Sequence, residues 1–309
     1  MLRSLLLLAT MTMACAAFAA GRSVDAGGFP ATLHDPAGAG PLVVMIAGSG
    51  PTDRDGNSAF GVTAASLRKL ADALAARGIG SLRYDKRGVP GSAPAGNEAD
   101  VTFSTYVDDL RSVAAWAAAR SPGRPLVLLG HSEGGLVALE ATRAAPDAVS
   151  GLVLLATPGR PLAEMLRDQL ANLPPPGRGE ALAILQELEA GRRVETVPAG
   201  LAGLFRPSVQ PFVVSLLALR PAAALTEVDM PVLVVGGGTD IQVGRADFDA
   251  LAGARADVAS RWFESMNHVL ADAPADRAAN IATYGDPDVP LVGGLVDTIA
   301  GFVDGIAAR

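Results

Sequence analysis

The chain has 309 residues, of which 50% are hydrophobic and 18% charged, and its formal net charge at pH 7 is −7. This length allows one large domain or two modest ones and is ample for a substantial core, and the high hydrophobicity excludes intrinsic disorder. The acidic excess disfavours nucleic acid as a partner, because phosphate neutralisation requires clustered Lys and Arg. One Cys and three His provide neither a disulfide framework nor a metal-ligand cluster. We therefore expect no metal and no cofactor.

Residues 1–19 are typical of a secretory signal peptide. Arg3 supplies the positive start, an apolar run follows, and Ala17-Phe18-Ala19 fits the small-x-small cleavage pattern. We expect cleavage after Ala19 and export to the periplasm or the extracellular medium. The alternatives are an uncleaved anchor, for which the apolar run is short, and a lipoprotein processed at Cys15. No later stretch predicts a membrane span, and the oligomeric state stays open.

After the leader, short apolar runs bounded by Gly or Pro alternate with helical patterns. Continuous Val, Leu and Ile runs are typical of strands buried on both faces of a parallel sheet. Strands that alternate with helices of this length predict right-handed crossovers and a doubly wound α/β sheet. The predicted strands are 41–47, 78–84, 125–129, 151–155, 231–235 and a more polar sixth at 256–264, and the first two predicted helices are 64–77 and 104–120.

Residues 159–225 interrupt this alternation. They contain no convincing buried strand, but helical spacing of apolar residues recurs at 161–173, 180–190 and 208–219, separated by Pro and Gly. The sequence thus predicts a helical lid insertion at 159–225 between two parts of one core, 20–158 and 226–309.

The most informative segment is Gly130-His131-Ser132-Glu133-Gly134-Gly135. It follows the predicted strand 125–129 directly and precedes a helical pattern at 136–145, which is the strand–turn–helix context that a Gly-x-Ser-x-Gly nucleophile elbow requires. The glycines avoid collisions at the sharp turn, and the helix directs its N–H groups toward developing negative charge. Ser132 is therefore the candidate nucleophile, with an ordinary helix N-cap as the alternative.

A serine nucleophile needs a general base, and the chain offers three histidines. His34 precedes the first predicted core strand, and His131 occupies a variable position of the elbow. His268 follows the last strand candidate, where a loop at the carboxyl edge of the sheet can reach Ser132. Elimination and position both favour His268 as the base.

The orienting acid is expected after the strand 231–235. Asp240 is the first carboxylate beyond it, on a loop that three glycines should make flexible. Asp247 and Asp249 lie in the following helical pattern and are poorer candidates. The order Ser132, Asp240, His268 is the nucleophile–acid–base order of the α/β-hydrolase fold.

An oxyanion hole needs two backbone N–H donors. One is expected at Glu133, the residue after the nucleophile, and the other in the loop that follows the first strong strand. In that loop Ser49 is the preferred donor and Gly50 the alternative, because Pro51 has no N–H.

These motifs resemble those of serine hydrolases of the α/β-hydrolase superfamily over nearly all of the mature chain. The segment Gly48 to Asn57 (GSGPTDRDGN) and the GHSEG elbow are similar to those of a bacterial carboxylesterase subfamily, as is the Asp85-Lys86-Arg87-Gly88 loop. The resemblance implies ester hydrolysis by an exported enzyme. For Asp53, Arg54, Asp85 and Arg87 we expect a structural role, in which charged pairs brace the oxyanion loop.

The sequence therefore predicts hydrolysis of a small-molecule carboxylic ester by a Ser132–His268–Asp240 triad. A peptidase or thioesterase would use the same residues, and a non-catalytic binding protein on the same fold is the alternative from another class. The proline-broken 159–225 insertion contains Phe205 and Phe212, whose apolar faces we expect over Ser132. Each acyl CH₂ that is buried there would favour binding until the pocket ends, and we expect a preference for acyl groups of about C2 to C8.

Overall fold

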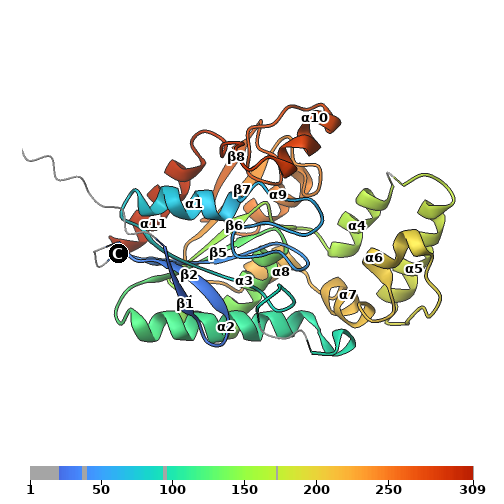
Figure 1. Cartoon of the computed structure of the whole chain (residues 1–309), viewed down its shortest axis with the longest axis horizontal. Helices are drawn as coiled ribbons and strands as arrows, with labels where there is room; N and C mark the ends of the chain where they lie inside the picture. Colours follow the sequence, from blue (N-terminus) through green and yellow to red (C-terminus); the bar gives the residue numbers. More distant parts are fainter. Residues whose placement is uncertain (1–20, 37–39, 93–95, 172, 309) are drawn as a thin grey trace, which may run out of the picture.

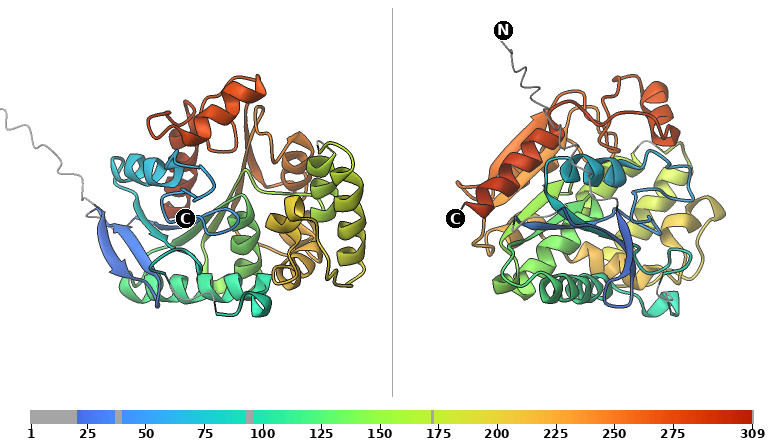
Figure 2. Two further views of the ribbon diagram at one scale, coloured as in Figure 1. Left: turned by 45° about the vertical axis from the view of Figure 1, so that its right-hand side comes forward. Right: turned by 60° about the vertical axis from the view of Figure 1, so that its left-hand side comes forward.

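The computed structural model describes residues 21–36, 40–92, 96–171 and 173–308. The predicted signal peptide, with Cys15, lies outside these ranges. An eight-stranded sheet forms the centre of the molecule, and helices cover both of its faces (Figure 1). Further helices gather at one end of the sheet, and the two additional views show the same arrangement (Figure 2).

Five parallel strands form the middle of the sheet, and all their residues are buried. They are β3 (Leu42–Ile46), β4 (Gly80–Tyr84), β5 (Leu126–His131), β6 (Gly151–Leu155) and β7 (Val232–Gly237). The strand order is β1-β2-β4-β3-β5-β6-β7-β8, with β8 (Ala259–Phe263) parallel to β7 at the edge. Helices cover both faces of the sheet, and β3, β5, β6 and β7 accordingly consist mostly of Val, Leu, Ile, Met and Gly, whereas β4 also contains Ser81 and Arg83. The predicted parallel sheet is thereby confirmed.

Two strands that the sequence pattern does not predict complete the sheet. Strands β1 (Arg22–Asp25) and β2 (Pro30–His34) form a hairpin, and β2 pairs antiparallel with β4. Strand β1 is mostly exposed and β2 alternates between half-buried and buried residues at its start. Neither strand therefore has the long apolar run that marks a central strand.

Side chains of β3, β5, β6 and β7 alternate between two cores on opposite faces of the sheet. In β3, Val43 and Met45 face helices α1 (Ser66–Ala75) and α11 (Leu295–Ala307), whereas Val44 faces the other core. That second core contains α2 (Phe103–Arg120), α3 (Glu133–Ala144) and α9 (Arg245–Ala252). The connecting segments contain α10 (Arg277–Ala282) and the 3-10 turns η1 (Glu98–Asp100), η2 (Pro146–Ala148) and η4 (Thr283–Gly285).

Helices follow one another without a strand between β6 and β7, in the part of 159–225 that the structure describes. They are α4 (Leu162–Leu170), α5 (Gly177–Glu189), η3 (Ala199–Leu201), α6 (Ala202–Phe205), α7 (Gln210–Leu217) and α8 (Pro221–Leu225). We call them the 159–225 helices. Helices α4 to α7 lie at the right of Figure 1, where α7 packs against α2, whereas α8 lies nearer the centre and packs against α3. Their division from the core as a separate lid stays a prediction.

Taken singly, no helix within the described residues is long and apolar enough to cross a bilayer. Among the described helices, only Ala199–Phe205 and Gln210–Leu217 taken together reach that length and hydropathy, and the two segments are bent by 58° relative to each other. Gln210 joins them, since its fully buried side-chain amide donates to the Phe205 carbonyl at 2.8 Å.

Glycines allow α3 to approach the sheet closely. A Cβ added at Gly134 would lie 2.4 Å from the Ile46 carbonyl oxygen of β3, and one at Gly130 would lie 2.2 Å from the Gly134 carbonyl oxygen. Both contacts are with backbone, which cannot rotate away. The start of α3 is therefore held against β3 and β5 at a distance that only glycine allows.

Adding a methyl group at this crossing should destabilise the fold. We expect Gly134→Ala to lower the free energy of unfolding by about 3 kcal/mol or more, because the backbone must shift. Gly301→Ala is the matched control, since Gly301 is an exposed residue of α11 with no atom within 4 Å of an added Cβ. Because alanine has a higher helix propensity than glycine, Gly301→Ala should raise the free energy of unfolding by up to about 1 kcal/mol. Equal urea midpoints for the two variants would contradict the packing argument.

Candidate active site

Ser132 lies at the turn between β5 and α3 in a backbone conformation that is rare for residues other than glycine. Its φ is 56° and its ψ is −125°, a strained region that costs about 1–3 kcal/mol. Backbone hydrogen bonds hold the turn: the Ser132 N–H donates to the Leu155 carbonyl of β6 at 2.9 Å, and the Gly135 N–H donates to the Ser132 carbonyl at 2.9 Å. The strain presents the hydroxyl at the carboxyl end of the sheet.

His268 lies within hydrogen-bond distance of Ser132. Its Nε2 is 3.0 Å from Ser132 Oγ, and it occupies the loop after β8. The neighbouring Asn267 is fully buried, and its side-chain amide donates to Thr283 Oγ1 at 2.7 Å and accepts from the Ala271 N–H at 3.1 Å. These bonds fix the loop, so the imidazole is oriented before any substrate binds.

Asp240 completes the chain of hydrogen bonds. Its Oδ2 is 2.7 Å from His268 Nδ1, and its Oδ1 accepts the N–H groups of Gln242 and Val243 at 2.7 and 2.9 Å. The Asp240 side chain is fully buried. A carboxylate held in this way keeps the second imidazole nitrogen protonated and stabilises an imidazolium.

The two other acidic candidates lie in different settings. Buried Asp247 accepts the N–H groups of Gly159 and Arg160 and pairs with the Arg160 guanidinium at 2.9 Å. Exposed Asp249 pairs with Arg245 one helical turn away. The structure thus brings Ser132, His268 and Asp240 together and places Asp247 and Asp249 elsewhere.

Two of the three glycines before Asp240 lie in a strand and not in the loop that the sequence predicted. Gly236 and Gly237 belong to β7, and a Cβ added at Gly237 would lie 2.1 Å from the Met266 carbonyl oxygen. One at Gly238 would lie 2.3 Å from the Glu264 carbonyl oxygen. The glycines are required because the acid-bearing segment packs directly on the backbone that leads to His268.

The segments that carry the two predicted oxyanion donors lie next to Ser132. Glu133 is the first residue of α3, where N–H groups have no partner within the helix. Gly48 approaches from the other side, because a Cβ added there would lie 3.3 Å from Ser132 Cβ, and Ser49 follows it. Within the described residues, neither the Ser49 nor the Glu133 N–H donates a hydrogen bond. Both are free to bind a substrate oxygen, and this role stays a prediction.

Charged side chains brace the loop after Ser49, as expected. Asp53 accepts the N–H groups of Asp55 and Asn57 at 2.9 and 2.8 Å. Asp85 accepts the Arg54 N–H at 2.8 Å and its guanidinium at 2.6 Å. Arg87 differs, since it pairs with Asp109 of α2 and thus holds the loop after β4 to that helix.

His131 occupies a variable position of the Gly-x-Ser-x-Gly pattern, but the structure gives its ring a defined contact. Its ring is buried, and its Nε2 lies 2.8 Å from the His268 carbonyl oxygen. The two imidazole rings lie 4.8 Å apart. Burial, with a smaller contribution from His268, lowers the pKa of His131 to about 3. His131 is therefore a neutral side chain that donates to the backbone of the base. Its 137-residue separation from His268 leaves no local signal in the sequence.

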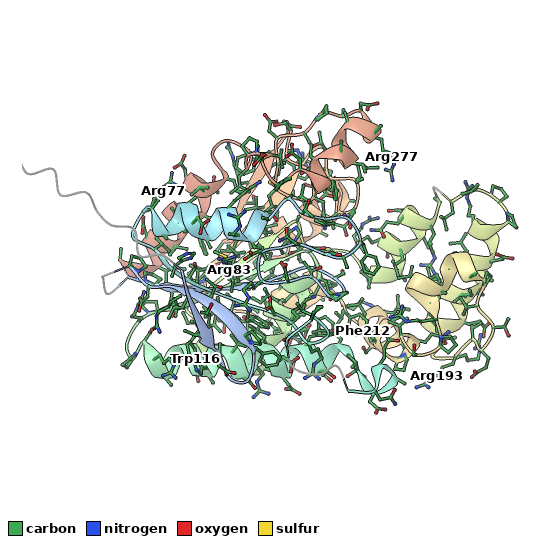
Figure 3. All side chains as sticks on the ribbon, viewed as in Figure 1. Arg77, Arg83, Trp116, Arg193, Phe212 and Arg277 are labelled. Carbon is green, nitrogen blue, oxygen red and sulfur yellow. The ribbon has the colours of Figure 1, made fainter. Side chains whose placement is uncertain are left out.

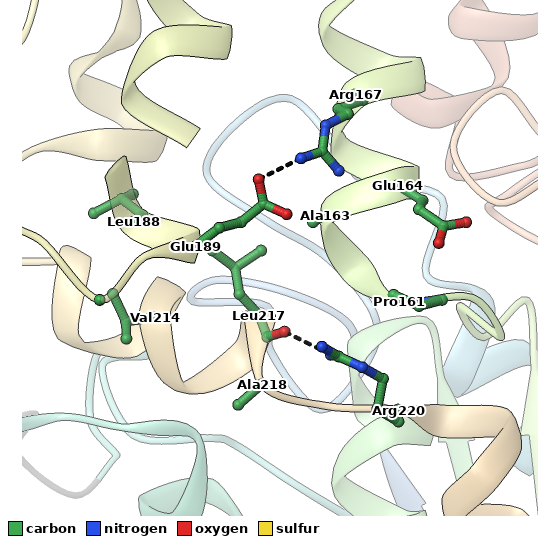
Figure 4. A pocket seen from close by; sticks show the side chains of 11 residues that line it. Pro161, Ala163, Glu164, Arg167, Leu188, Glu189, Val214, Leu217, Ala218 and Arg220 are labelled. Atoms are coloured by element: carbon green, nitrogen blue, oxygen red, sulfur yellow. Dashed lines mark hydrogen bonds and ion pairs between the residues drawn. The ribbon is translucent and has the colours of Figure 1, made fainter. Parts of the chain in front are cut away.

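One cavity lies among the 159–225 helices. It measures about 530 Å³, and residues of α4, α5 and α7 line it. Arg167 and Glu189 form an ion pair across it, and Arg220 donates to the Leu217 carbonyl beside it (Figure 4). Neither the triad residues nor the predicted oxyanion donors line this cavity.

The aromatic residues of these helices also differ from expectation. Phe205 was expected to face Ser132 but is fully buried in the main core cluster. Phe212 lies where α7 meets α2 (Figure 3), and its ring is edge-on to Tyr106 with centroids 5.5 Å apart. Aromatic contact thus anchors α7 to the core.

Comparison with known proteins supports this architecture. Residues 59–196 match the family model described as serine aminopeptidase, S33. Esterase EstD of Thermotoga maritima is 30% identical over 268 residues, which are 81% of this chain and 60% of that protein. The chain therefore spans about three fifths of the length of this curated relative.

Solved structures show a similar fold at low sequence identity. Est1E from Butyrivibrio proteoclasticus with bound ferulic acid has a TM-score of 0.62 and 17% identity, covering 93% of this chain and 100% of that one. Proline iminopeptidase from Mycobacterium smegmatis has a TM-score of 0.58 and 19% identity, covering 94% and 100%. Mouse alpha/beta hydrolase domain-containing protein 10 has a TM-score of 0.57 and 20% identity, covering 93% and 100%. The predicted α/β-hydrolase fold is confirmed.

Acidification should destabilise the protein in part through His131. The pKa of His131 is about 3 in the folded protein and about 6.5 when unperturbed, so between these values the unfolded chain binds a proton that the folded protein excludes. We expect this residue to lower the free energy of unfolding by up to about 1.4 kcal/mol per pH unit as the pH falls through that window. Urea denaturation of wild type and His131→Gln measures both slopes. The free energy of unfolding should fall less steeply with decreasing pH in the variant than in the wild type. Equal slopes would refute the assignment of a low pKa to His131.

Proposed function

We propose that this chain, a member of the α/β-hydrolase superfamily, hydrolyses carboxylic esters through an acyl-enzyme formed on Ser132. The observation that carries the proposal is the unbroken chain of contacts from Asp240 through His268 to Ser132, at 2.7 and 3.0 Å. The similarity to an esterase supports the choice of substrate class. The chain would act as a serine hydrolase that needs no cofactor.

In the first half-reaction, Ser132 Oγ attacks the ester carbonyl carbon while His268 Nε2 accepts its proton. Asp240 stabilises the resulting imidazolium, and the N–H groups of Ser49 and Glu133 bind the oxyanion of the tetrahedral intermediate. The positive end of the α3 dipole lies beside this negative charge. Collapse of the intermediate breaks the ester bond, and His268 returns the proton to the leaving alcohol.

In the second half-reaction, water replaces the alcohol. His268 removes a proton from the water molecule as its oxygen attacks the acyl carbonyl, and a second tetrahedral intermediate uses the same two N–H donors. Its collapse breaks the bond to Ser132 Oγ, which regains its proton from His268. The carboxylic acid leaves, and the hydrogen-bonded triad is restored.

Amide hydrolysis is the second candidate, because residues 59–196 match a serine aminopeptidase family model. The same triad attacks either carbonyl, so the geometry of Ser132 does not separate the two reactions. Parallel assays with p-nitrophenyl butyrate and amino-acid p-nitroanilides on the mature protein separate them. Acyl thioesters in the same panel test the thioesterase alternative.

We also propose that the protein works outside the cytoplasm after its leader is removed. Support comes from residues 1–19 alone, with their basic start, apolar run and small residues before the predicted cut. Amino-terminal sequencing of protein recovered from the periplasm or medium should begin at Ala20. Retention in membranes with a lipid on Cys15 would favour the lipoprotein alternative.

Substitution of the triad tests the function directly. We expect Ser132→Ala and His268→Ala each to remove nearly all esterase activity, and the double variant to be scarcely worse, because the residues act as one unit. Labelling by a fluorophosphonate should require Ser132. Ser112→Ala is the control, since this exposed serine only donates to the Asp108 carbonyl within α2. An unlabelled wild-type protein would favour a non-catalytic binding protein.

The acyl-chain preference tests the part played by the 159–225 helices. Phe205 and many other apolar residues of these helices pack against one another and the core, which leaves little apolar surface for a long acyl chain. We therefore expect kcat/KM to be highest for acyl groups of about C2 to C8, with a gain of up to about 0.8 kcal/mol for each buried CH₂. A series of p-nitrophenyl esters measures this. A maximum at long chains, or activation at a lipid–water interface, would instead indicate a lipase.

A further inference from the structure

Lys86 is the one lysine whose side chain is almost fully buried among the described residues, and it lies against the candidate active site. It follows β4, and its side chain is 2% exposed. Its ammonium lies 5.4 Å from the centre of the Tyr106 ring and 3.8 Å from the Glu133 carboxylate. It donates a hydrogen bond to the Gly48 carbonyl oxygen. A buried ammonium is costly, so this placement calls for an explanation.

The Gly48 carbonyl belongs to the same peptide unit as the Ser49 N–H. In a planar trans peptide the C=O and N–H bonds point in opposite directions. A donor that fixes the carbonyl on one side therefore fixes the direction of the N–H on the other. Gly48 is packed against Ser132, so the orientation of this peptide decides whether the Ser49 N–H can reach the oxyanion.

The geometry points to Lys86 as the positioning residue of the oxyanion hole, an inference that rests on the proposed function. Lys86 contacts the units that carry both predicted donors, namely the Gly48–Ser49 peptide and the side chain of Glu133. It thereby holds the two N–H groups at a fixed separation. Its charge also polarises the Gly48–Ser49 peptide and strengthens the Ser49 N–H as a donor, because hydrogen bonds in a chain reinforce one another.

The other cations near this loop are used differently. Arg54 and Arg83 form ion pairs with Asp85 and Asp55, which brace the segment after the oxyanion loop. Lys86 directs its hydrogen bond to a backbone carbonyl, while its carboxylate neighbour stays beyond hydrogen-bond distance. Burial lowers the pKa of Lys86, and the charge of Glu133 opposes this change.

Replacement by a neutral side chain of similar length tests the inference. We expect Lys86→Met to lower kcat for p-nitrophenyl butyrate by about 10- to 100-fold, up to the loss seen when one oxyanion donor is removed, with KM nearly unchanged. The affinity for a trifluoromethyl ketone, whose adduct with Ser132 carries an oxyanion, should fall by the same factor as kcat/KM. A loss confined to KM, or unchanged kcat, would overturn the inference.

The chain provides a matched control. Lys69, the other lysine, also donates to a backbone carbonyl, that of Val289 at 2.5 Å. Lys69→Met removes an equivalent bond away from the oxyanion peptide and should leave kcat and inhibitor affinity unchanged. A similar loss of kcat in both variants would show that Lys86 acts only through general stability.

A second variant guards against misfolding, because Lys86→Met leaves Glu133 buried without its counterion. Lys86→Met/Glu133→Gln removes both charges and keeps the backbone N–H of residue 133. We expect the double variant to unfold at the same temperature as Glu133→Gln. Its kcat should be lower than that of Glu133→Gln by the factor that separates Lys86→Met from the wild type. Equal kcat in these two variants would overturn the inference.

A spectroscopic readout separates this inference from the proposed function. In ¹⁵N-labelled protein, the Ser49 amide proton resonance should move upfield in Lys86→Met and stay in place in Lys69→Met, because only Lys86 polarises that peptide. If the wild type hydrolyses no ester, the proposed function fails, yet this shift still decides the role of Lys86. An unmoved Ser49 resonance would refute the positioning role even in an active enzyme.

Discussion

The close packing of α3 on the ends of β3 and β5 is the constraint on which the candidate site depends. Glycine at 130 and 134 lets backbone approach backbone, and the chain can then turn within one residue, Ser132, at a positive φ. That turn places the serine hydroxyl at the carboxyl end of the sheet and the first N–H of α3 beside it. The candidate nucleophile and one predicted oxyanion donor thus arise from one steric arrangement.

The candidate base, His268, and the candidate acid, Asp240, are positioned by a second close approach of two backbone segments. Glycines at the end of β7 let the segment that bears Asp240 lie directly on the backbone that leads to His268. Buried amides of Asn267 and Asn280 then tie the His268 loop to the residues around α10 and η4. The His131 ring adds a hydrogen bond to the His268 carbonyl oxygen. Rigid positioning of this kind is what an acyl-transfer site requires, since its groups must be aligned before the substrate binds.

Charge is distributed around the site according to burial. The Arg54–Asp85 and Arg87–Asp109 pairs are partly exposed and hold loops to the core. Lys86 and Glu133 are buried together beside the oxyanion peptide. Water screens a buried charge only weakly. At the short distance between Lys86 and the Gly48–Ser49 peptide, the charge of this one lysine can therefore influence that peptide unit.

The sequence by itself determined the central strands, the elbow around Ser132 and the order of the three candidate catalytic residues. These signals are local: an apolar run, a glycine pattern between strand and helix, or a carboxylate placed directly after a strand. Even the choice of His268 needed only the small number of histidines and its position after the last strand.

Only the tertiary structure decided the antiparallel hairpin β1–β2, the burial of Phe205 and the contacts of His131 and Lys86. Each depends on partners far away in the chain: the His131 ring meets residue 268, and the Lys86 ammonium meets residues 48 and 133. A sequence shows what each residue can donate, accept or bury, but long-range packing selects its partner. For that reason the candidate triad was visible in the sequence, whereas the residues around it that contact its members became visible only in the fold.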